Sequence, residues 1–288
     1  MNRALPNEER EWLAVARDMT RAGEKAVLPL AGTQDGRCPI GQGEGGDITV
    51  ALDARAEEAM LDVLRELAPA PYNLVSEELG ITLEEGAQWW VVVDPVDGSL
   101  NAKRGLDPFC GVVAVSRGPT LGDVTLGHTR VYGSGREYVA GRGQGITIPE
   151  HRGQGAPNLD GEVELVLVEA GAPSRHHFLY RDLMLARNIG ESPEARIRQV
   201  GSLAAALCLV ASEVADILVA PVGSRSVDVA AGFLTVEEAG GGVASLDGES
   251  LHQRPLDLRR RSPFIAWRRG LDGEALREEA VSLLERPA

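Results

Sequence analysis

The sequence Trp89-Trp90-Val91-Val92-Val93-Asp94-Pro95-Val96-Asp97-Gly98-Ser99-Leu100-Asn101 begins as an apolar run and then changes abruptly to aspartates, a proline and a glycine. Short apolar runs that are rich in β-branched residues and bounded by turn residues are typical of buried strands, so we expect Asp94 at the carboxyl end of a strand. Pro95 favours extended geometry at Asp94, and Gly98 permits a tight turn whose amides can face an anion. Carboxylates beside such a turn suggest a divalent metal and a phosphate, although an ordinary Asp-Gly turn after a strand has the same pattern.

Length and composition limit the class of protein. The chain has 288 residues, of which 43% are hydrophobic, and this is enough for one large domain or two closely packed domains. Asp and Glu number 43 against 29 Lys and Arg, and the formal charge of -14 argues against nucleic acid or an anionic membrane as the main partner. The charged N-terminus lacks a secretory apolar segment, and the longest apolar run, residues 203–211, is too short to span a bilayer.

The three cysteines, Cys38, Cys110 and Cys208, are scattered and odd in number. They form no CxxC pair and no disulfide framework, which favours a reducing, cytoplasmic setting. We assign no chemistry to them.

The N-terminal half is predicted to combine helices with a mixed or antiparallel sheet. Its pattern predicts helices over residues 8–28 and 54–67 and strands over residues 48–53, 72–75, 109–115, 123–132, 137–140 and 145–148. The glycine-rich segment 31–47 is predicted to be a mobile surface loop. It contains a match to GxGxxG, but the match lacks the preceding strand and following helix of a dinucleotide site.

The C-terminal half is predicted to alternate strands and helices. The Gly and Pro breaks within residues 152–157 mark the expected boundary between an α+β domain over residues 1–152 and an α/β domain over residues 153–288. The pattern predicts strands over residues 163–168, 196–200, 214–220 and 264–267 and helices over residues 175–188, 202–212, 226–239 and 273–284. This alternation implies helices packed on a sheet.

Several carboxylates have ordinary structural explanations when each is taken alone. Asp53 falls at the N-cap position of the helix over residues 54–67, and Glu77 follows a strand in what could be an exposed acidic turn. Asp228 falls in the first turn of a helix that Ser226 could cap, where a carboxylate offsets the helix dipole. The small residues 230–232 would let this helix approach another backbone or a ligand closely.

Six motifs in order resemble the inositol monophosphatase superfamily of metal-dependent, lithium-sensitive phosphatases. The most specific motifs are residues 94–99 (DPVDGS) and 227–232 (VDVAAG), and the supporting matches are residues 47–53, 76–78, 138–145 and 196–202. The resemblance extends over nearly the whole chain. It implies a fold of mixed α+β and α/β class, built as a layered αβαβα sandwich of the sugar phosphatase type.

The resemblance also implies a catalytic site with two or three Mg²⁺ ions. Glu77, Asp94 and the Val96 carbonyl would hold one ion, and Asp94, Asp97 and Asp228 would hold a second. Oxygen ligands of this kind suit Mg²⁺, and a pair of ions can clamp both oxygens of an in-line phosphoryl displacement.

Catalysis and substrate binding are implied at the same place. Glu77 and Ser99 would position the attacking water, and Asp53 would orient the Ser99 hydroxyl. The Gly98 and Ser99 amides would receive the phosphate. The complete set of implied substrate contacts is Asp97, Gly98, Ser99, Gly201, Ser202, Arg225 and Asp228.

Departures from the family pattern bear on the substrate. Inositol-specific relatives carry a glutamate near Ala220 or Pro221 that is absent here, whereas residues 101–105 and Arg225 are similar to the archaeal-type branch, whose members often hydrolyse fructose bisphosphate as well. Val227 stands where the second motif often has Trp, and it would alter packing only. The loop over residues 31–47 has Arg37 in place of the family's lysine, so the sequence leaves open whether a third metal binds there.

The leading hypothesis is therefore a Mg²⁺-dependent phosphomonoesterase that acts on inositol monophosphate or a related sugar or polyol phosphate. One alternative is a fructose bisphosphatase, favoured by Arg225 and the missing glutamate. Another is a regulatory member that binds a protein partner, as some bacterial relatives do with the transcription and ribosome-assembly machinery. The resemblance also implies a homodimer.

Overall fold

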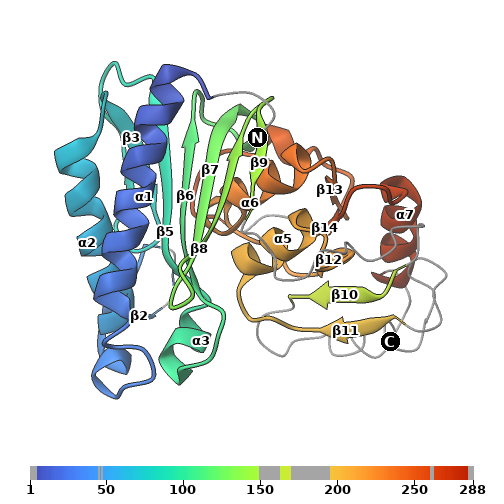
Figure 1. The fold of residues 1–288 in the computed structure, drawn as a ribbon, viewed down its shortest axis with the longest axis horizontal. Coiled ribbons are helices and arrows are strands. Elements are labelled where there is room, and N and C mark those ends of the chain that lie inside the picture. Colours follow the sequence, from blue (N-terminus) through green and yellow to red (C-terminus); the bar gives the residue numbers. More distant parts are fainter. Residues whose placement is uncertain are drawn as a thin grey trace.

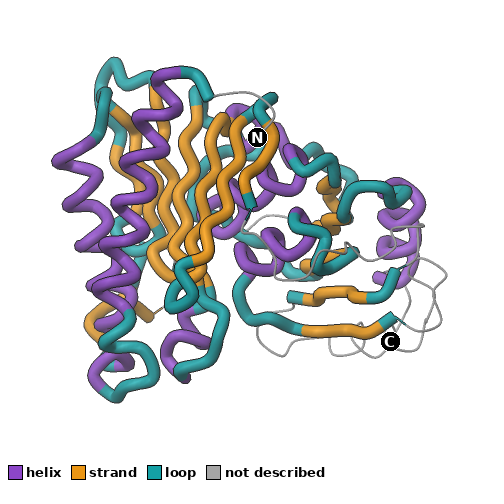
Figure 2. Tube along the Cα trace, viewed as in Figure 1, coloured by secondary structure: helices purple, strands orange, loops and turns teal. Residues whose placement is uncertain are grey.

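The described part of the protein has two large β-sheets, a separate two-stranded hairpin and three layers of helices. The computed structural model describes residues 5–44, 46, 48–148, 163–169, 195–259 and 263–284. Its larger sheet has the strand order β4-β3-β5-β6-β7-β8-β9, and its smaller sheet has the order β11-β10-β12-β14-β13. Helices α1 and α2 cover the outer face of the larger sheet, α5 and α6 lie between the sheets, and α7 lies beyond the smaller sheet (Figures 1 and 2). The predicted αβαβα sandwich is confirmed.

The elements have the following bounds. The α-helices are α1 Asn7–Val27, α2 Ala51–Leu67, α3 Ser99–Arg104, α5 Leu203–Ala211, α6 Ser226–Glu238 and α7 Gly273–Leu284. The strands of the larger sheet are β3 Tyr72–Ser76, β4 Gly80–Thr82, β5 Trp89–Asp97, β6 Cys110–Ser116, β7 Val124–Val131, β8 Arg136–Gly141 and β9 Gly145–Thr147. The strands of the smaller sheet are β10 Leu165–Val168, β11 Arg196–Arg198, β12 Ile217–Ala220, β13 Gly242–Ser245 and β14 Phe264–Trp267, and a separate hairpin pairs β1 Pro39–Gln42 with β2 Ile48–Val50.

The larger sheet is buried on both faces. On the outer face Trp12 of α1 and Met60 of α2 belong to one apolar cluster with Val91 and Val113, and the Trp12 ring lies 5.6 Å from that of Trp89. This burial explains why β5 has no polar residue before Asp94.

Helix α6 approaches the inner face of the larger sheet closely, as its small residues predicted. A Cβ atom on Gly127 of β7 would lie 2.8 Å from the Ala231 carbonyl, and one on Gly232 would lie 2.4 Å from a methyl carbon of Leu207 on α5. The absence of side chains at these points therefore brings the start of α6, with Asp228, against the sheet.

The strand order places two acidic segments at one edge of the larger sheet. Strands β3 and β5 are parallel neighbours, and Ser76 pairs with Val93. Because parallel strands end at the same edge, Glu77 and Asp94 emerge side by side. The predicted position of Asp94 near the end of a buried strand is confirmed, although strand pairing continues to Asp97 with an irregular register.

The first half differs from the prediction in two places. Helix α2 begins at Ala51 with Val50 as its N-cap residue, so Asp53 lies in the first turn and the predicted N-cap role is wrong. Part of the predicted loop 31–47 is strand β1, in which Gln42 pairs with Ile48. This exposed, glycine-rich strand has no alternation of apolar residues that could have predicted it.

The second half also contains corrections. Ser202 caps α5, because its hydroxyl accepts a hydrogen bond from the Ala205 amide. Ser226 does not cap α6: Arg225 is the N-cap residue, and the Ser226 hydroxyl donates to the Asp257 carbonyl at 2.6 Å. Strand β13 was not predicted, and neither was β4 in the first half of the chain. The predicted helix over residues 175–188 and the boundary within residues 152–157 lie outside the described residues, so the two-domain division stays a prediction.

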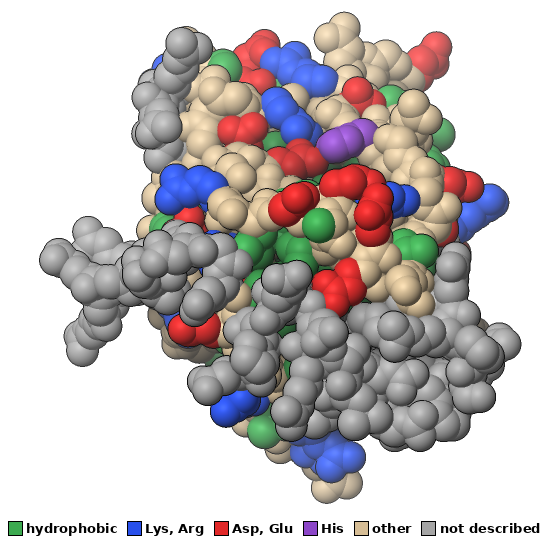
Figure 3. Space-filling model, turned by 90° about the vertical axis from the view of Figure 1, so that its right-hand side faces the viewer, with side chains coloured by type: hydrophobic (Ala, Val, Ile, Leu, Met, Phe, Trp, Pro, Cys, Tyr) green, Lys and Arg blue, Asp and Glu red, His purple; other side chains and the backbone are tan. Residues whose placement is uncertain are grey.

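The described surface carries part of the acidic excess. Figure 3 shows acidic side chains gathered near the middle of one face, in keeping with the formal charge of -14. In the described part of the chain, no helix combines the length and the apolar character that crossing a bilayer requires.

Candidate active site

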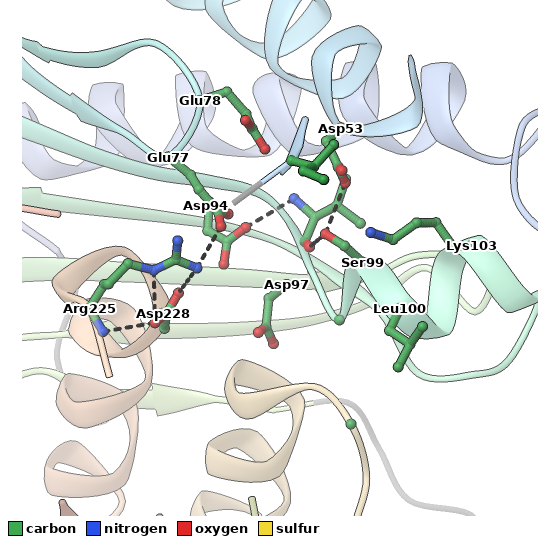
Figure 4. Close-up of a pocket in the computed structure, with 14 residues that line it drawn as sticks. Asp53, Glu77, Glu78, Asp94, Asp97, Ser99, Leu100, Lys103, Arg225 and Asp228 are labelled. Atoms are coloured by element: carbon green, nitrogen blue, oxygen red, sulfur yellow. Dashed lines mark hydrogen bonds and ion pairs between the residues drawn. The ribbon is translucent and has the colours of Figure 1, made fainter. Parts of the chain in front are cut away.

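A cavity of about 550 Å³ lies where Glu77 and Asp94 emerge from the larger sheet (Figure 4). It contains every predicted site residue except Ser202, which lies behind Asp97. Its charged lining consists of the six carboxylates Asp53, Glu77, Glu78, Asp94, Asp97 and Asp228 and the two cations Lys103 and Arg225. The cavity therefore has an excess of negative charge.

The turn after β5 is shaped by Gly98. Its φ angle is +89°, in the left-handed region that other residues avoid, and a Cβ atom there would lie 3.1 Å from the Gly201 carbonyl oxygen. On the strand side, the Val96 amide donates to Asp94 at 3.0 Å. The DPVDGS motif thus folds tightly enough to present Asp94, Asp97 and Ser99 to one cavity.

Asp94 is the most confined carboxyl group of the site, with 1% of its surface exposed. Burial, followed by repulsion from Glu77, Asp97 and Asp228, holds the pKa of Asp94 well above its usual value. Burial likewise raises the pKa of Glu77 to about 7, with attraction from Arg225 opposing it. These carboxylates are crowded in a way that a cation would relieve.

Asp97 joins the metal-site loop to helix α5. Its Oδ2 accepts from the Ser202 hydroxyl at 2.5 Å and the Ala204 amide at 2.7 Å, and its Oδ1 accepts from the Leu203 amide at 3.2 Å. Burial raises the pKa of Asp97 to about 6 in spite of these bonds. The predicted residue Ser202 thus acts on Asp97 rather than on the cavity directly.

Ser99 lies at the start of α3 with its hydroxyl oxygen 2.9 Å from both Asp53 Oδ1 and the Val96 carbonyl. Its proton can serve either acceptor. Burial raises the pKa of Asp53, while the Ser99 hydrogen bond and Lys103 oppose the shift. The pairing of Ser99 with Asp53 is the arrangement that the resemblance implied.

Arg225 reaches into the carboxylate group from the N-terminus of α6. Its Nη2 atom lies 2.5 Å from Glu77 Oε1 and 3.2 Å from Asp228 Oδ1, and its amide donates to Asp228 Oδ2 at 2.8 Å. The guanidinium predicted to contact substrate therefore pairs with two of the predicted metal ligands (Figure 4).

The residues present fit a divalent cation. Within the described residues, no group of three or more His, Cys, Asp or Glu side chains has the geometry of a formed metal site. The Arg225 guanidinium lies among the carboxylates instead. The donor set nevertheless has the chemistry that hard cations require, since it is all oxygen and mostly anionic. Its raised pKa values show that the protein alone does not neutralise it.

Sequence reasoning missed several residues that shape the site. Glu57 of α2 accepts from the Ser76 hydroxyl at 2.5 Å and from the Glu78 and Leu79 amides at 3.2 and 3.0 Å, so it fixes the turn that carries Glu77. A charged residue on the buried face of a helix, four positions after Asp53, was the available signal. Further lining residues are Ile48, Glu78, Leu100 and Lys103. Arg37 is not among the lining residues, and its side chain donates to the Lys103 carbonyl at 2.6 Å.

Comparison with known proteins agrees with this geometry. A model of the inositol monophosphatase family matches residues 9–283. The fructose-1,6-bisphosphatase/inositol-1-monophosphatase of Methanothermobacter thermautotrophicus is 33% identical over 267 residues, which cover 88% of this chain and 91% of that protein. Nus factor SuhB of Pasteurella multocida is 31% identical over 207 residues, 70% of this chain and 73% of that protein.

Solved structures show the same fold. The extragenic suppressor protein suhB of Bartonella henselae matches with a TM-score of 0.73 at 23% identity, over 96% of this chain and 99% of that one. The predicted resemblance to the superfamily and its archaeal-type branch is confirmed. The chain belongs to the inositol monophosphatase family of metal-dependent phosphatases, and it is a phosphoric monoester hydrolase.

Proposed function

We propose that the protein is a Mg²⁺-dependent phosphomonoesterase that hydrolyses inositol monophosphate or a related sugar or polyol phosphate. The observation that carries the proposal is the cavity itself, in which six carboxylates, all within the family's motifs, face two cations. Such a charge balance suits a site that binds divalent metal before it binds a phosphate ester.

The proposed ligands divide into two overlapping sets. Glu77, Asp94 and the Val96 carbonyl would hold one Mg²⁺, and Asp94, Asp97 and Asp228 would hold the second. Bound Mg²⁺ would supply charge neutralisation for the phosphoryl group and a more acidic water. Arg225, which pairs with Glu77 and Asp228, lies beside ligands of both proposed ions.

The chain's own groups would orient the reactants. Glu77 and Ser99 would hold the attacking water, and Asp53 would direct the Ser99 hydroxyl through the contact at 2.9 Å. The amides of Gly98 and Ser99 would receive phosphate oxygens, and Lys103, which points into the cavity from α3 (Figure 4), would attract the anion.

Fructose bisphosphate is the second candidate substrate. The glutamate of inositol-specific relatives is absent near Ala220, and Arg225 offers a guanidinium that could grip a second phosphate bidentately once it leaves Glu77. The name of the Methanothermobacter relative, which includes both activities, supports this candidate.

A regulatory role is the third candidate, supported by the resemblance to Nus factor SuhB of Pasteurella multocida. The acidic surface disfavours direct nucleic-acid contact but permits a protein partner. A pull-down with an Asp94→Asn variant tests it, because partner binding should survive the loss of catalysis.

We further propose a cytoplasmic homodimer. Three free cysteines, two of them buried, suit a reducing compartment. Light scattering on the purified protein measures the oligomeric state.

A panel of phosphate esters tests the leading proposal. Phosphate release from inositol 1-phosphate, fructose 1,6-bisphosphate and other sugar phosphates is measured with Mg²⁺ and with a chelator. We expect Mg²⁺-dependent release that the chelator abolishes. Equal release in both conditions would contradict metal dependence, and no release from any ester would contradict the phosphatase assignment.

A further inference from the structure

Glu169 is a carboxylate behind the site, directly after β10 of the smaller sheet. It accepts a hydrogen bond from the Val200 amide at 2.6 Å, and both its oxygens lie within reach of the Gly201 amide, at 3.0 and 3.2 Å. No cation is among its recorded partners in the described residues. Two backbone amides of one turn therefore hold this carboxylate.

The turn that Glu169 holds is tightly constrained. Gly201 has a φ angle of +79°, and a Cβ atom there would lie 2.7 Å from Asn101 Oδ1. From the opposite side, the Asn101 side chain of α3 donates to the Val200 carbonyl and to the Pro108 carbonyl, each at 2.8 Å. Glu169 and Asn101 thus hold the amides and the carbonyl of one short segment.

The same segment continues directly into the groups that bind Asp97. The next residue, Ser202, donates its hydroxyl to Asp97, and the amides of Leu203 and Ala204 follow. A displacement of the turn over residues 200–201 would therefore move three donors on Asp97.

A partly buried carboxylate that has no cation among its partners in the described part of the chain is costly unless it meets a specific need. Burial, opposed by the two amides, raises the pKa of Glu169 to about 7, so its charge is not favoured by the surroundings. Its benefit is that it satisfies two adjacent amides of a turn in left-handed geometry, which a single neutral acceptor would do less well.

We propose that Glu169 is a positioning residue for the phosphatase reaction, which fixes the turn over residues 200–201 and thereby sets Ser202 and Asp97 for metal and substrate. The inference rests on the proposed function. Residues that orient metal ligands in this indirect way typically contribute about 10- to 100-fold to metal affinity or activity.

The test compares Glu169→Gln with Glu164→Gln, an exposed glutamate just before the same strand. Mn²⁺ is the probe, and its affinity is measured by calorimetry on the purified proteins. We expect Glu169→Gln to weaken Mn²⁺ binding by about 10-fold or more and to lower kcat, while the control matches the wild type. A merely structural residue would lower the melting temperature and leave Mn²⁺ affinity unchanged.

A double-mutant cycle with Ser202→Ala tests whether Glu169 acts on Asp97 through Ser202. If Glu169 acts through Ser202, the two losses of Mn²⁺ affinity are not additive; additive losses, or an effect equal to that of the control, overturn the proposal. Should Glu169→Gln fail to fold, Asn101→Ala loosens the same turn from its other side and must show the same coupling.

Failure of the proposed function is distinguishable from failure of this inference. Wild-type protein that releases no phosphate from any ester refutes the function alone. In that case hydrogen exchange at the Leu203 and Ala204 amides still decides the positioning role: faster exchange in Glu169→Gln than in Glu164→Gln supports it, and equal exchange refutes it.

Discussion

Asp94 is the residue on which both proposed metal positions depend. We predict that Asp94→Asn reduces phosphate release to background while the fold is kept, because the asparagine can still accept from the Val96 amide but no longer carries charge. Without metal, the variant should melt at the same or a higher temperature, since burial and repulsion disfavour the Asp94 charge. Phosphate assays and melting curves in chelator measure both effects. Wild-type turnover with unchanged Mg²⁺ demand would refute the assignment.

Arg225 is expected to favour a bisphosphate substrate over a monophosphate substrate. We predict that Arg225→Ala lowers kcat/KM for fructose 1,6-bisphosphate by roughly 10- to 100-fold more than for inositol 1-phosphate, because only a bisphosphate can use a second charged hydrogen-bonding group. Both substrates are assayed at saturating Mg²⁺, since the variant also loses the ion pairs with Glu77 and Asp228. Arg225→Lys should be intermediate. Equal losses on both substrates would make Arg225 a structural residue.

Lithium provides a chemical probe of the site made by Asp94, Asp97 and Asp228. Li⁺ is close to Mg²⁺ in size and accepts the same hard oxygen ligands, but it has half the charge, so it can occupy the site without stabilising the leaving oxygen. We predict inhibition by millimolar Li⁺ that weakens as Mg²⁺ rises, measured as phosphate release with Na⁺ at equal ionic strength as control. If Li⁺ and Na⁺ behave identically at limiting Mg²⁺, the ligand assignment must be redrawn.

Among the elements, helices α3 and α5 begin close to each other, because Gly98 before α3 lies against Gly201 before α5. Gly98→Ala would place a methyl group 3.1 Å from the Gly201 carbonyl and would also cost about 1–2 kcal/mol for left-handed geometry. We therefore predict a loss of both stability and activity. Gly86→Ala is the matched control, because Gly86 has a φ angle of +79° but open space around it. Its melting temperature should fall comparably while its activity stays, and equal activity in both variants would contradict the prediction.

The elements also show how far local sequence information extends. Strand β5 was predictable because its apolar run is confined to buried positions, and the approach of α6 followed from its small residues. The start of α2 was misplaced because Ala51 and Leu52 suit either a strand end or a first helical turn. The role of Glu169 depends on a turn 31 residues further along the chain, and no periodicity within β10 encodes that contact.

In the whole molecule, the crowded carboxylates couple stability to pH and metal. The raised pKa values of Glu77 and Glu169, both about 7, mean that the folded protein binds these protons more tightly than the unfolded chain does. Metal-free stability should therefore fall as pH rises from 6.5 to 8. Below pH 6.5 the lowered pKa of buried His128 acts in the opposite direction, because only the unfolded chain then gains that proton.

Metal should reverse this dependence. Mg²⁺ binds the ionised carboxylates, so we predict that the increase in melting temperature on adding Mg²⁺ is larger at pH 8 than at pH 6.5. Melting curves at both pH values, with excess Mg²⁺ or with chelator, measure the difference. In Asp94→Asn the metal-free curve should depend less on pH and Mg²⁺ should stabilise less, because one of the crowded charges and the shared ligand are both gone. An equal Mg²⁺ shift at the two pH values in the wild type would mean that the carboxylates of the cavity are not the groups that bind the metal.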